Sequence, residues 1–539
     1  MISSVGPLDP HEPGDGLSRR ELLSRAAAGG FALSATGLLA ACGSSGKSSS
    51  GASTSTPVGG GTPRKGGTLR MGIGGGGPAD SLDPQVVLDG PDGMYAFAMF
   101  DQLNLVDEQM VLGNRLAEEF SPNKDATQWS VRVKQDVEFH DGKTLSADDV
   151  IFSFARMFSP KNHATDAWIG AFVKSMKKLD PRTVRFELNQ PVGWFDLAVG
   201  DGGVTGIVPV GFDPKAPIGT GPFKYVSFTP GQEAVFERFP NYWNGPALLD
   251  QLTITTINDD TARLGALLTH QIDMSASILA SQVPQVKSVS TLQLYNTRSS
   301  GCNPITMRVD KAPFSDVRVR QAIRLCIDRP QALEAAYSGY GFVGSDLYSP
   351  FDPAFDSSLK RTQDLEQARS LLKQAGQSDL NVQLVTAQLF PGLVEQCQVV
   401  AQNASQIGAT INVRVIDAAT LFGPNYLSWP LAIDVYPGLR YLTTSALADG
   451  PFAVIDETHF HLPQYESLWK QASATLDTGT RTRILHEMQQ ILFDQGGFII
   501  PTYGNAITSL SKSIGGFRSE DLRGYTPGAT RLNELHFTD

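Results

Sequence analysis

The sequence predicts an α/β fold with more than one lobe. Strand-like and helix-like segments follow one another along the whole chain rather than in separate blocks, which is typical of sheets covered by helices. Beyond an N-terminal export and linker region, about 470 residues remain, too many for a single hydrophobic core. Hydrophobic residues make up 41% of the chain and charged residues 18%, the balance of an ordinary globular protein.

Residues 1–41 have the pattern of an export signal. Arg19 and Arg20 precede an apolar run from Ala26 to Ala41, which is shorter than the roughly 20 residues that a membrane-spanning helix needs. The paired arginines resemble the twin-arginine signal, which exports folded proteins. Leu22 stands where that motif usually carries Phe, so the general secretory route stays open as an alternative.

The Leu-Ala-Ala-Cys stretch that ends at Cys42 resembles the bacterial lipobox. The resemblance implies cleavage before Cys42 and a diacylglyceryl group on its sulfur, which would anchor the mature protein to the cell membrane on its extracytoplasmic face. An ordinary signal with an incidental cysteine is the alternative. Residues 42–65 are mostly Ser, Gly, Thr and Pro, and such a composition predicts a flexible linker, with a reach of about 25 Å.

Composition excludes some classes of protein. A net charge of −11 argues against nucleic acid as a partner, because phosphate binding needs a basic face. Cys302, Cys326 and Cys397 have no spacing typical of a metal or redox motif, so we expect no cofactor and no metal. One disulfide among them is possible in an exported protein, but the sequence favours buried free thiols.

Periodicity places the main elements. Alternating or apolar runs predict strands at 68–74, 129–139 and 183–188. Helical periodicity predicts helices at 146–158, with Ser146 as N-cap, at 316–328, and at 365–377, with Gly376 as C-cap. In the 316–328 helix we expect Val317, Ala322 and Ile323 to face the core and the arginines to point outward. Gly219 and Gly221 predict a tight turn into a strand, and Tyr242 and Trp243 a turn that packs on the body.

Two motifs have both a chemical and a structural interpretation. Gly72, Gly74 and Gly77 satisfy GxGxxG after a strand, but no helix can open directly behind them because Pro78 and Pro84 follow. We therefore favour a glycine-rich loop that something approaches closely. His140 and Asp141 could form an acid–base pair, but a polar turn between a strand and a helix is favoured.

A third motif lies near the C-terminal end of the chain. On a strand, His459 and His461 would share a face with Glu457, which is one way to hold a metal. Solvated histidines are the favoured interpretation. No sequence motif of a serine hydrolase, a zinc protease or a P-loop nucleotide-binding enzyme occurs.

Five ordered blocks carry a family resemblance. They are "GGTLRMGI…DSLDP" (66–84), "VEFHDGKTLSADDVIFSFARM" (137–157), "IGTGPFKY" (218–225), "FPNYWNG" (239–245) and "APFSDVRVRQAIRLCIDRPQAL" (312–333). Together they resemble the extracellular solute-binding proteins of peptide, nickel and oligosaccharide importers of the ATP-binding-cassette (ABC) class. The resemblance extends from about Gly66 to the C-terminus.

The resemblance implies a periplasmic-binding-protein-like fold of two α/β lobes with a discontinuous first lobe and a hinge of two crossings. Lobe I would comprise 66–297 and 500–539, and lobe II 298–499, with crossings near 295–303 and 496–503. A small polar solute or short peptide would be enclosed between the lobes as the hinge closes. The closed protein, a monomer without catalytic activity, would then dock on an ABC permease.

The resemblance also suggests residues that contact the solute. The loop after the first strand supplies Asp80 and Ser81. The segment 429–441 matches the region where peptide-binding members carry an Asp for the peptide's amino terminus; Leu439 and Arg440 stand about there, and Asp434 lies five to six residues earlier. Arg440 would suit a carboxylate or other acceptor-rich solute; a position on the rim of the site, without contact to the solute, is the alternative. The aromatic candidates for the walls are Trp429, Tyr436 and Tyr441, for which core packing is the alternative.

Two other functions stay open at this point. One is an exported hydrolase that uses two carboxylates, which leave no fixed spacing in a sequence. The other is a lipoprotein that binds a solute in order to contact a sensor.

Overall fold

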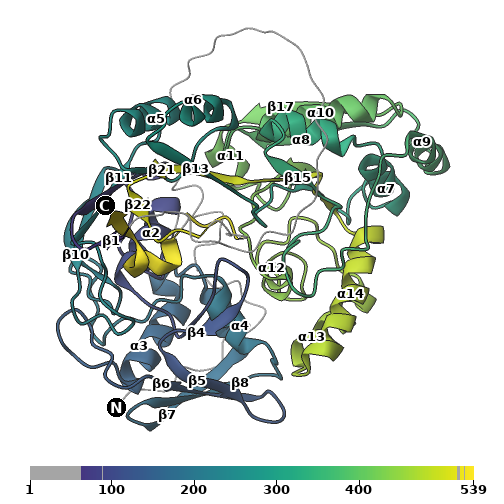
Figure 1. Ribbon diagram of the computed structural model, residues 1–539. Helices are drawn as coiled ribbons and strands as arrows, with labels where there is room; N and C mark the ends of the chain where they lie inside the picture. Colours follow the sequence, from purple (N-terminus) through teal and green to yellow (C-terminus); the bar gives the residue numbers. More distant parts are fainter. Residues whose placement is uncertain (1–61, 88, 519–522, 527) are drawn as a thin grey trace.

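The computed structural model describes residues 62–87, 89–518, 523–526 and 528–539 (Figure 1). The signal at 1–41, Cys42 and most of the 42–65 linker lie outside the described residues. Within the described parts, no helix combines the length and the apolar character needed to cross a membrane. The first strand, β1 (Pro63–Arg64), pairs with β23 (His536–Thr538) near the C-terminal end of the chain.

A seven-stranded sheet forms one body of the molecule, with α2 (Gly90–Met99), α5 (Asp260–Leu268) and α6 (Val283–Lys287) beside it. Its order is β13 (Leu292–Thr297), β21 (Ala506–Ser511), β12 (Met274–Ser275), β2 (Thr68–Ile73), β11 (Gln251–Thr256), β10 (Glu233–Arg238) and β9 (Phe223–Thr229). The strand predicted at 68–74 is confirmed as β2. Strand β2 runs parallel to β11 and β12, and β21 returns antiparallel from the far end of the chain.

Smaller sheets complete this body. The antiparallel sheet at the bottom of Figure 1 has the order β5 (Ala117–Pro122), β6 (Gln128–Val133), β8 (Thr183–Leu188) and β7 (Val173–Asp180). Nearby lie β3 (Asn104–Val106), β4 (Leu112–Asn114), α3 (Ala147–Phe158), α4 (Phe195–Asp201) and the short 3₁₀ turns Pro160–Asn162 and Ala167–Phe172. The chain ends in β22 (Ile514–Gly515), a 3₁₀ segment (Ala529–Glu534) and β23.

Sequence signals at the ends of helices and strands in this body agree with the structure only in part. Helix α3 begins after Ser146, whose capping box with Asp149 confirms the prediction. The strand predicted at 129–139 is too long: β6 ends at Val133, and Asp136 has a positive φ of 58°, which turns the chain. Gly219 does precede strand β9. Glycine is needed there because the backbone passes close to Met99: a Cβ would lie 1.9 Å from the Met99 carbonyl oxygen.

A five-stranded sheet forms the second body, in the order β17 (Thr410–Ile416), β16 (Asn381–Ala387), β18 (Leu431–Ile433), β14 (Ile305–Met307) and β19 (Phe498–Ile499). Its helices are α7 (Val317–Leu325), α8 (Arg329–Tyr337), α9 (Leu365–Gln374), α10 (Leu393–Ser405), α11 (Ala418–Leu421), α12 (Tyr441–Ala448), α13 (Pro463–Ala474) and α14 (Thr478–Gln495). The α9 prediction is confirmed, with Gly376 at a φ of 67° just beyond its end.

The outward orientation predicted for the arginines of α7 is wrong for Arg320 and Arg324, which are buried. Arg320 donates to the Gln495 carbonyl oxygen and Arg324 to those of Leu492 and Asp494. These carbonyls belong to the end of α14, where a helix has no acceptor partners of its own and carries partial negative charge. The two guanidinium groups therefore cap a helix that follows α7 by more than 150 residues.

We call the body around the seven-stranded sheet lobe I and the body around the five-stranded sheet lobe II. The chain passes between the two sheets at residues 298–304 and again at 500–505, beside a small pairing of β15 (Gly341–Val343) with β20 (Thr502–Gly504). The domain limits expected from the sequence stay a prediction. Cys302, Cys326 and Cys397 are buried and unbridged, as the sequence favoured.

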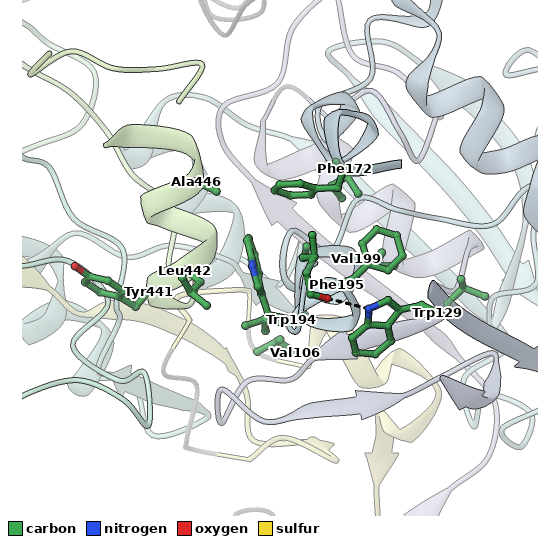
Figure 2. Packing of buried hydrophobic residues seen from close by; sticks show 14 of the residues in the cluster. Val106, Trp129, Phe172, Trp194, Phe195, Val199, Tyr441, Leu442 and Ala446 are labelled. Carbon is green, nitrogen blue, oxygen red and sulfur yellow. Dashed lines mark hydrogen bonds between the residues drawn. The ribbon is translucent and has the colours of Figure 1, made fainter. Parts of the chain in front are cut away.

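One hydrophobic core cluster extends through residues of both lobes. Figure 2 shows its centre, where Trp194 lies between Phe195 of α4 and Leu442 of α12. The two lobes are therefore in direct contact, and the residues that join them define where a solute could be held.

Candidate functional site

Arg440 ties the two lobes together. As N-cap of α12 in lobe II, its backbone N–H donates to Asp201 Oδ2 of lobe I at 2.8 Å. Its side chain donates from Nη1 to the Met110 carbonyl oxygen of lobe I at 2.8 Å and from Nε to Asp352 Oδ2 at 2.9 Å. Both Nε and Nη1 of the guanidinium group therefore already donate to protein oxygens.

Asp201 also holds a buried ion pair on the other side of this contact. Arg523 Nη1 lies 2.6 Å from Asp201 Oδ1, and both side chains are at most 1% exposed. Burial alone would lower the pKa of Arg523, but Tyr525 and Asp201 outweigh it and raise the pKa, so the arginine stays charged. The carboxylate of Asp201 thus joins a segment near the C-terminus to α12 of lobe II.

A second set of contacts joins the Gly193–Trp194 segment of lobe I to helices α13 and α14 of lobe II. The Trp194 indole N–H donates to Ser473 Oγ at 2.9 Å, and the Gly193 N–H donates to the Ser473 carbonyl oxygen at 2.6 Å. Arg481 Nη1 donates back to the Gly193 carbonyl oxygen at 2.9 Å. The Trp194 and Trp469 rings meet edge to face with centroids 6.4 Å apart. These contacts make the described arrangement a closed one.

The aromatic candidate Tyr441 is part of the lobe II interior. It is fully buried, its ring stacks on Tyr348 at 4.9 Å, and its N–H donates to Asp352. Tyr348, Tyr465 and Ser445 all donate hydroxyl hydrogens to Asp449, and burial raises the pKa of that carboxyl to about 7.

Asp434 and Tyr436 belong to a second buried network in lobe II. The Tyr426 hydroxyl lies 2.8 Å from Asp434 and 2.7 Å from Glu457, and the Tyr436 hydroxyl donates to Glu457 at 2.6 Å. Burial and the neighbouring Asp434 raise the pKa of Glu457 well above its usual range. Trp429, which donates to the Leu421 carbonyl oxygen, joins Asp434 in lining a cavity of about 10 Å³. A space of this size holds one water rather than a solute.

Asp80 and Ser81 fix the glycine-rich loop that follows β2. Asp80 accepts from the backbone N–H groups of Gly77 at 2.6 Å and Gly231 at 3.1 Å. The Ser81 N–H donates to Asp92 at 2.8 Å. The next helix, α2, begins only at Gly90, so the geometry of a dinucleotide fingerprint is not formed.

The histidine motifs have structural roles. His461 lies 3.1 Å from Asp456, whereas Glu457 points to the tyrosines of lobe II, so the three residues suggested as metal ligands do not converge. His140 accepts from the Gly219 N–H, and its Nε2 lies 3.0 Å from the Gly221 carbonyl oxygen. Burial lowers the pKa of His140 to about 4, so it stays neutral and supports a turn.

Arg298, at the start of the first crossing, was not identified from the sequence. Its guanidinium lies over the rings of Phe342 and Phe351, at 4.2 and 4.8 Å from their centroids. Although the residue is exposed, partial burial of the guanidinium lowers its pKa, and among the described residues no carboxylate acts on the group. Phe351 directly precedes Asp352, the partner of Arg440. No local pattern could reveal this cluster, because its rings come from 44 and 53 positions further along the chain.

Comparison with known proteins assigns the family. The sequence pattern of bacterial extracellular solute-binding proteins, family 5 (middle region), matches residues 112–436. The chain belongs to this family. It is thus an extracytoplasmic solute-binding component of an ABC importer and not an enzyme, which excludes the hydrolase.

The similarity to known proteins covers most of the chain. The glutathione-binding protein GsiB of Escherichia coli K12 is 24% identical over 459 residues, covering 81% of this chain and 89% of its own. DppA of Helicobacter pylori, solved with the peptide STSA, has 20% identity, a TM-score of 0.75 and coverage of 88% and 99%. AgaA of A. tumefaciens R10, solved with agropinic acid, has 20% identity, a TM-score of 0.76 and the same coverage. The two solved structures share the fold, which confirms the predicted fold class.

Two buried carboxyl groups should make the free energy of unfolding depend on pH. Burial raises the pKa of Asp449 to about 7 and that of Asp166 to about 6. The folded protein therefore holds protons that the unfolded chain releases above about pH 4. We expect the free energy of unfolding to fall as the pH rises from about 4 to 7, by up to ~1.4 kcal/mol per pH unit for each acid while the pH stays below the pKa of that acid in the folded protein. Urea titrations across this range check it; a stability that is flat or rises with pH would contradict it, and Asp449→Asn should reduce the slope.

Proposed function

We propose that this chain captures a small anionic or acceptor-rich polar solute between lobes I and II and delivers it, as a monomer, to an ABC permease. A lipid on Cys42 would hold it at the outer face of the cell membrane after export by the twin-arginine route. Family membership supports the transport role, and the crossing residue Arg298 is the observation that supports the solute class.

Arg298 has the properties of an anion-binding group. Its planar face rests on Phe342 and Phe351, which fixes the fork while leaving its N–H edges available. An arginine in this position donates bidentately to a carboxylate and cannot lose its proton. Arg440, the arginine suggested by the sequence, would act at the same contact by holding the lobes closed rather than by binding the solute with its whole fork.

The other suggested residues would shape the site. Asp80 and Ser81 would present the glycine-rich loop at its edge. Side chains of lobe II would support the wall behind it: the buried Asp434, Tyr436 and Tyr441, and the half-buried Trp429. The relatives are compatible with more than one solute, since one is named for glutathione and solved neighbours hold a peptide and agropinic acid.

Unmodified di- to pentapeptides should bind weakly or not at all. Asp434 is 1% exposed, and Asp201 and Asp352 already accept from arginines, so none of these three carboxylates would be available to a peptide's ammonium group. Leaving a buried charge unpaired costs several kcal/mol, which corresponds to about a thousandfold in affinity. Calorimetric titration with free and N-acetylated peptides measures this. Micromolar binding that disappears on N-acetylation and in Asp434→Asn would restore an ordinary peptide importer.

Membrane attachment should depend on Cys42 alone. We expect Cys42→Ser to release the mature body from membranes, because its sulfur is the proposed lipid attachment point. Cell fractionation after a salt wash measures the distribution, with Cys397→Ser, a buried thiol of lobe II, as the matched control. A Cys42→Ser protein that stays with the membrane would place the anchor elsewhere.

A further inference from the structure

Three carboxylates meet where the glycine-rich loop faces the start of α2. Asp80 comes from the loop, Asp89 is the N-cap of α2, and Asp92 lies in its first turn. One oxygen from each lies within 4.8 Å of the other two. Asp80 and Asp92 are buried and Asp89 is half-buried. Within the described parts of the chain, this is the one group of three acidic, histidine or cysteine side chains that converge in this way.

Two of the three carboxylates, Asp80 and Asp89, lie without a protein cation beside them in the described structure. In the described structure neither Asp80 nor Asp89 forms an ion pair with a lysine or arginine. Asp80 accepts from two backbone N–H groups and Asp89 from the N–H of Asp92. Since a carboxylate, once ionised, offers about four lone-pair positions, the oxygens of both can take a cation as a further partner. Buried carboxylates normally have a paired cation or coordinate a metal.

A separate observation points to a ligand at the same place. The hydroxyl of Tyr95, on α2, is fully buried and forms no hydrogen bond, although the charges of Asp80, Asp92 and Asp89 all act on it. Its ring is held by Phe228 and Phe236, with centroids 5.4 and 6.0 Å away. Thr256 Oγ1 is near enough to influence this hydroxyl but is likewise buried without a hydrogen bond of normal geometry.

The glycine-rich loop closes over these oxygens. A Cβ placed on Gly76 would lie 2.6 Å from Asp80 Oδ2 and 2.9 Å from Thr256 Oγ1. A side chain at this position would therefore occupy the space beside both oxygens. The glycine keeps that space available to a small occupant.

We infer that Asp80, Asp89 and Asp92, with the Tyr95 hydroxyl beside them, form a binding site for a divalent cation, with Ca²⁺ as the best match. The donor set contains only oxygen, which suits a hard cation and excludes the nitrogen and sulfur ligands that zinc prefers. Calcium accepts six to eight oxygens in irregular geometry, so backbone carbonyls and water would complete the shell. The bound ion would fasten the glycine-rich loop of lobe I to α2.

Calorimetric titration of chelator-treated protein with CaCl₂ tests this inference. The informative variant is Asp89→Asn, because asparagine caps a helix as well as aspartate does but removes one charge from the site. Asp364→Asn is the matched control, since Asp364 caps α9 in the same way with no acidic cluster around it. Tyr95→Phe keeps the ring contacts and removes only the hydroxyl.

We expect one Ca²⁺ per chain, with a dissociation constant of about 10⁻⁴–10⁻³ M, the range of extracellular calcium modules. Asp89→Asn should weaken it at least tenfold, Tyr95→Phe severalfold, and Asp364→Asn not at all. Ca²⁺ should also raise the melting temperature of the wild-type protein but not that of Asp89→Asn. An absence of binding by Ca²⁺, Mg²⁺ and Mn²⁺ alike would overturn the inference, as would equal binding by wild type and Asp89→Asn.

Discussion

Replacing Asp201 with asparagine is expected to lower the free energy of unfolding by about 3–5 kcal/mol, the usual cost of removing one partner from a buried ion pair. Arg523 would keep its charge in a place where it is 1% exposed, and the amide NH2 would face one of the two donors, since only the amide oxygen can accept. This is the largest stability effect that we expect from a single substitution in the contact between the lobes.

The same substitution should also open the protein. Asp201 of lobe I accepts from the Arg440 N–H of lobe II, so its loss weakens the closed arrangement as well as the fold. Urea unfolding measures the first effect and the radius of gyration in solution measures the second. Glu237→Gln is the control, because the Glu237–Lys224 pair lies on the surface, where such pairs contribute about 0–1 kcal/mol. An Asp201→Asn protein that is as stable and as compact as Glu237→Gln would contradict this account of closure.

Replacing Arg298 with glutamine is expected to reduce solute affinity by about 10- to 150-fold, since hydrogen bonds to a charged group contribute ~1.5–3 kcal/mol. Stability should change little, because the guanidinium makes ring contacts but no ion pair with any residue that the structure describes. Arg298→Lys should lie between the two, since an ammonium keeps the charge but lacks the planar fork.

The control for this prediction is Arg414→Gln. Arg414 is on β17, at the edge of the five-stranded sheet of lobe II, and its guanidinium donates to Gln383 Oε1 at 3.5 Å. The Arg414→Gln substitution removes the same charge as Arg298→Gln, but from a place away from the crossings. Equal loss of affinity in both variants would show that net charge rather than a specific contact matters, and would contradict the assignment to Arg298.

The parts of the fold that depend on neighbouring residues were predictable. The capped helices α3 and α9 and the strands β2 and β8 follow from periodicity and from residues within one turn of each end. The ordered family blocks predicted the fold class, because they occur over most of the chain.

The parts that depend on distant residues were not predictable. Arg320 and Arg324 look like the polar face of an amphipathic helix until α14 is placed against them. The sequence suggested Arg440 as a solute contact, which stays a prediction, and its partners Asp201 and Met110 are more than 200 positions away. Arg298 gives no signal in the sequence, since its proposed role depends on contacts with Phe342 of β15 and with Phe351 in the segment that follows.

The most direct test of the central claim is mass spectrometry of the solute that the protein retains. Wild-type and Arg298→Gln proteins, both stripped of ligand, would be incubated with growth medium and cell extract of the native host, desalted, and compared under non-denaturing conditions. We expect the wild type to retain one small solute with a carboxylate or another anionic group, and Arg298→Gln to lose it. Retention of an uncharged or cationic solute, equal retention by both proteins, or no retention by the wild type would contradict the account.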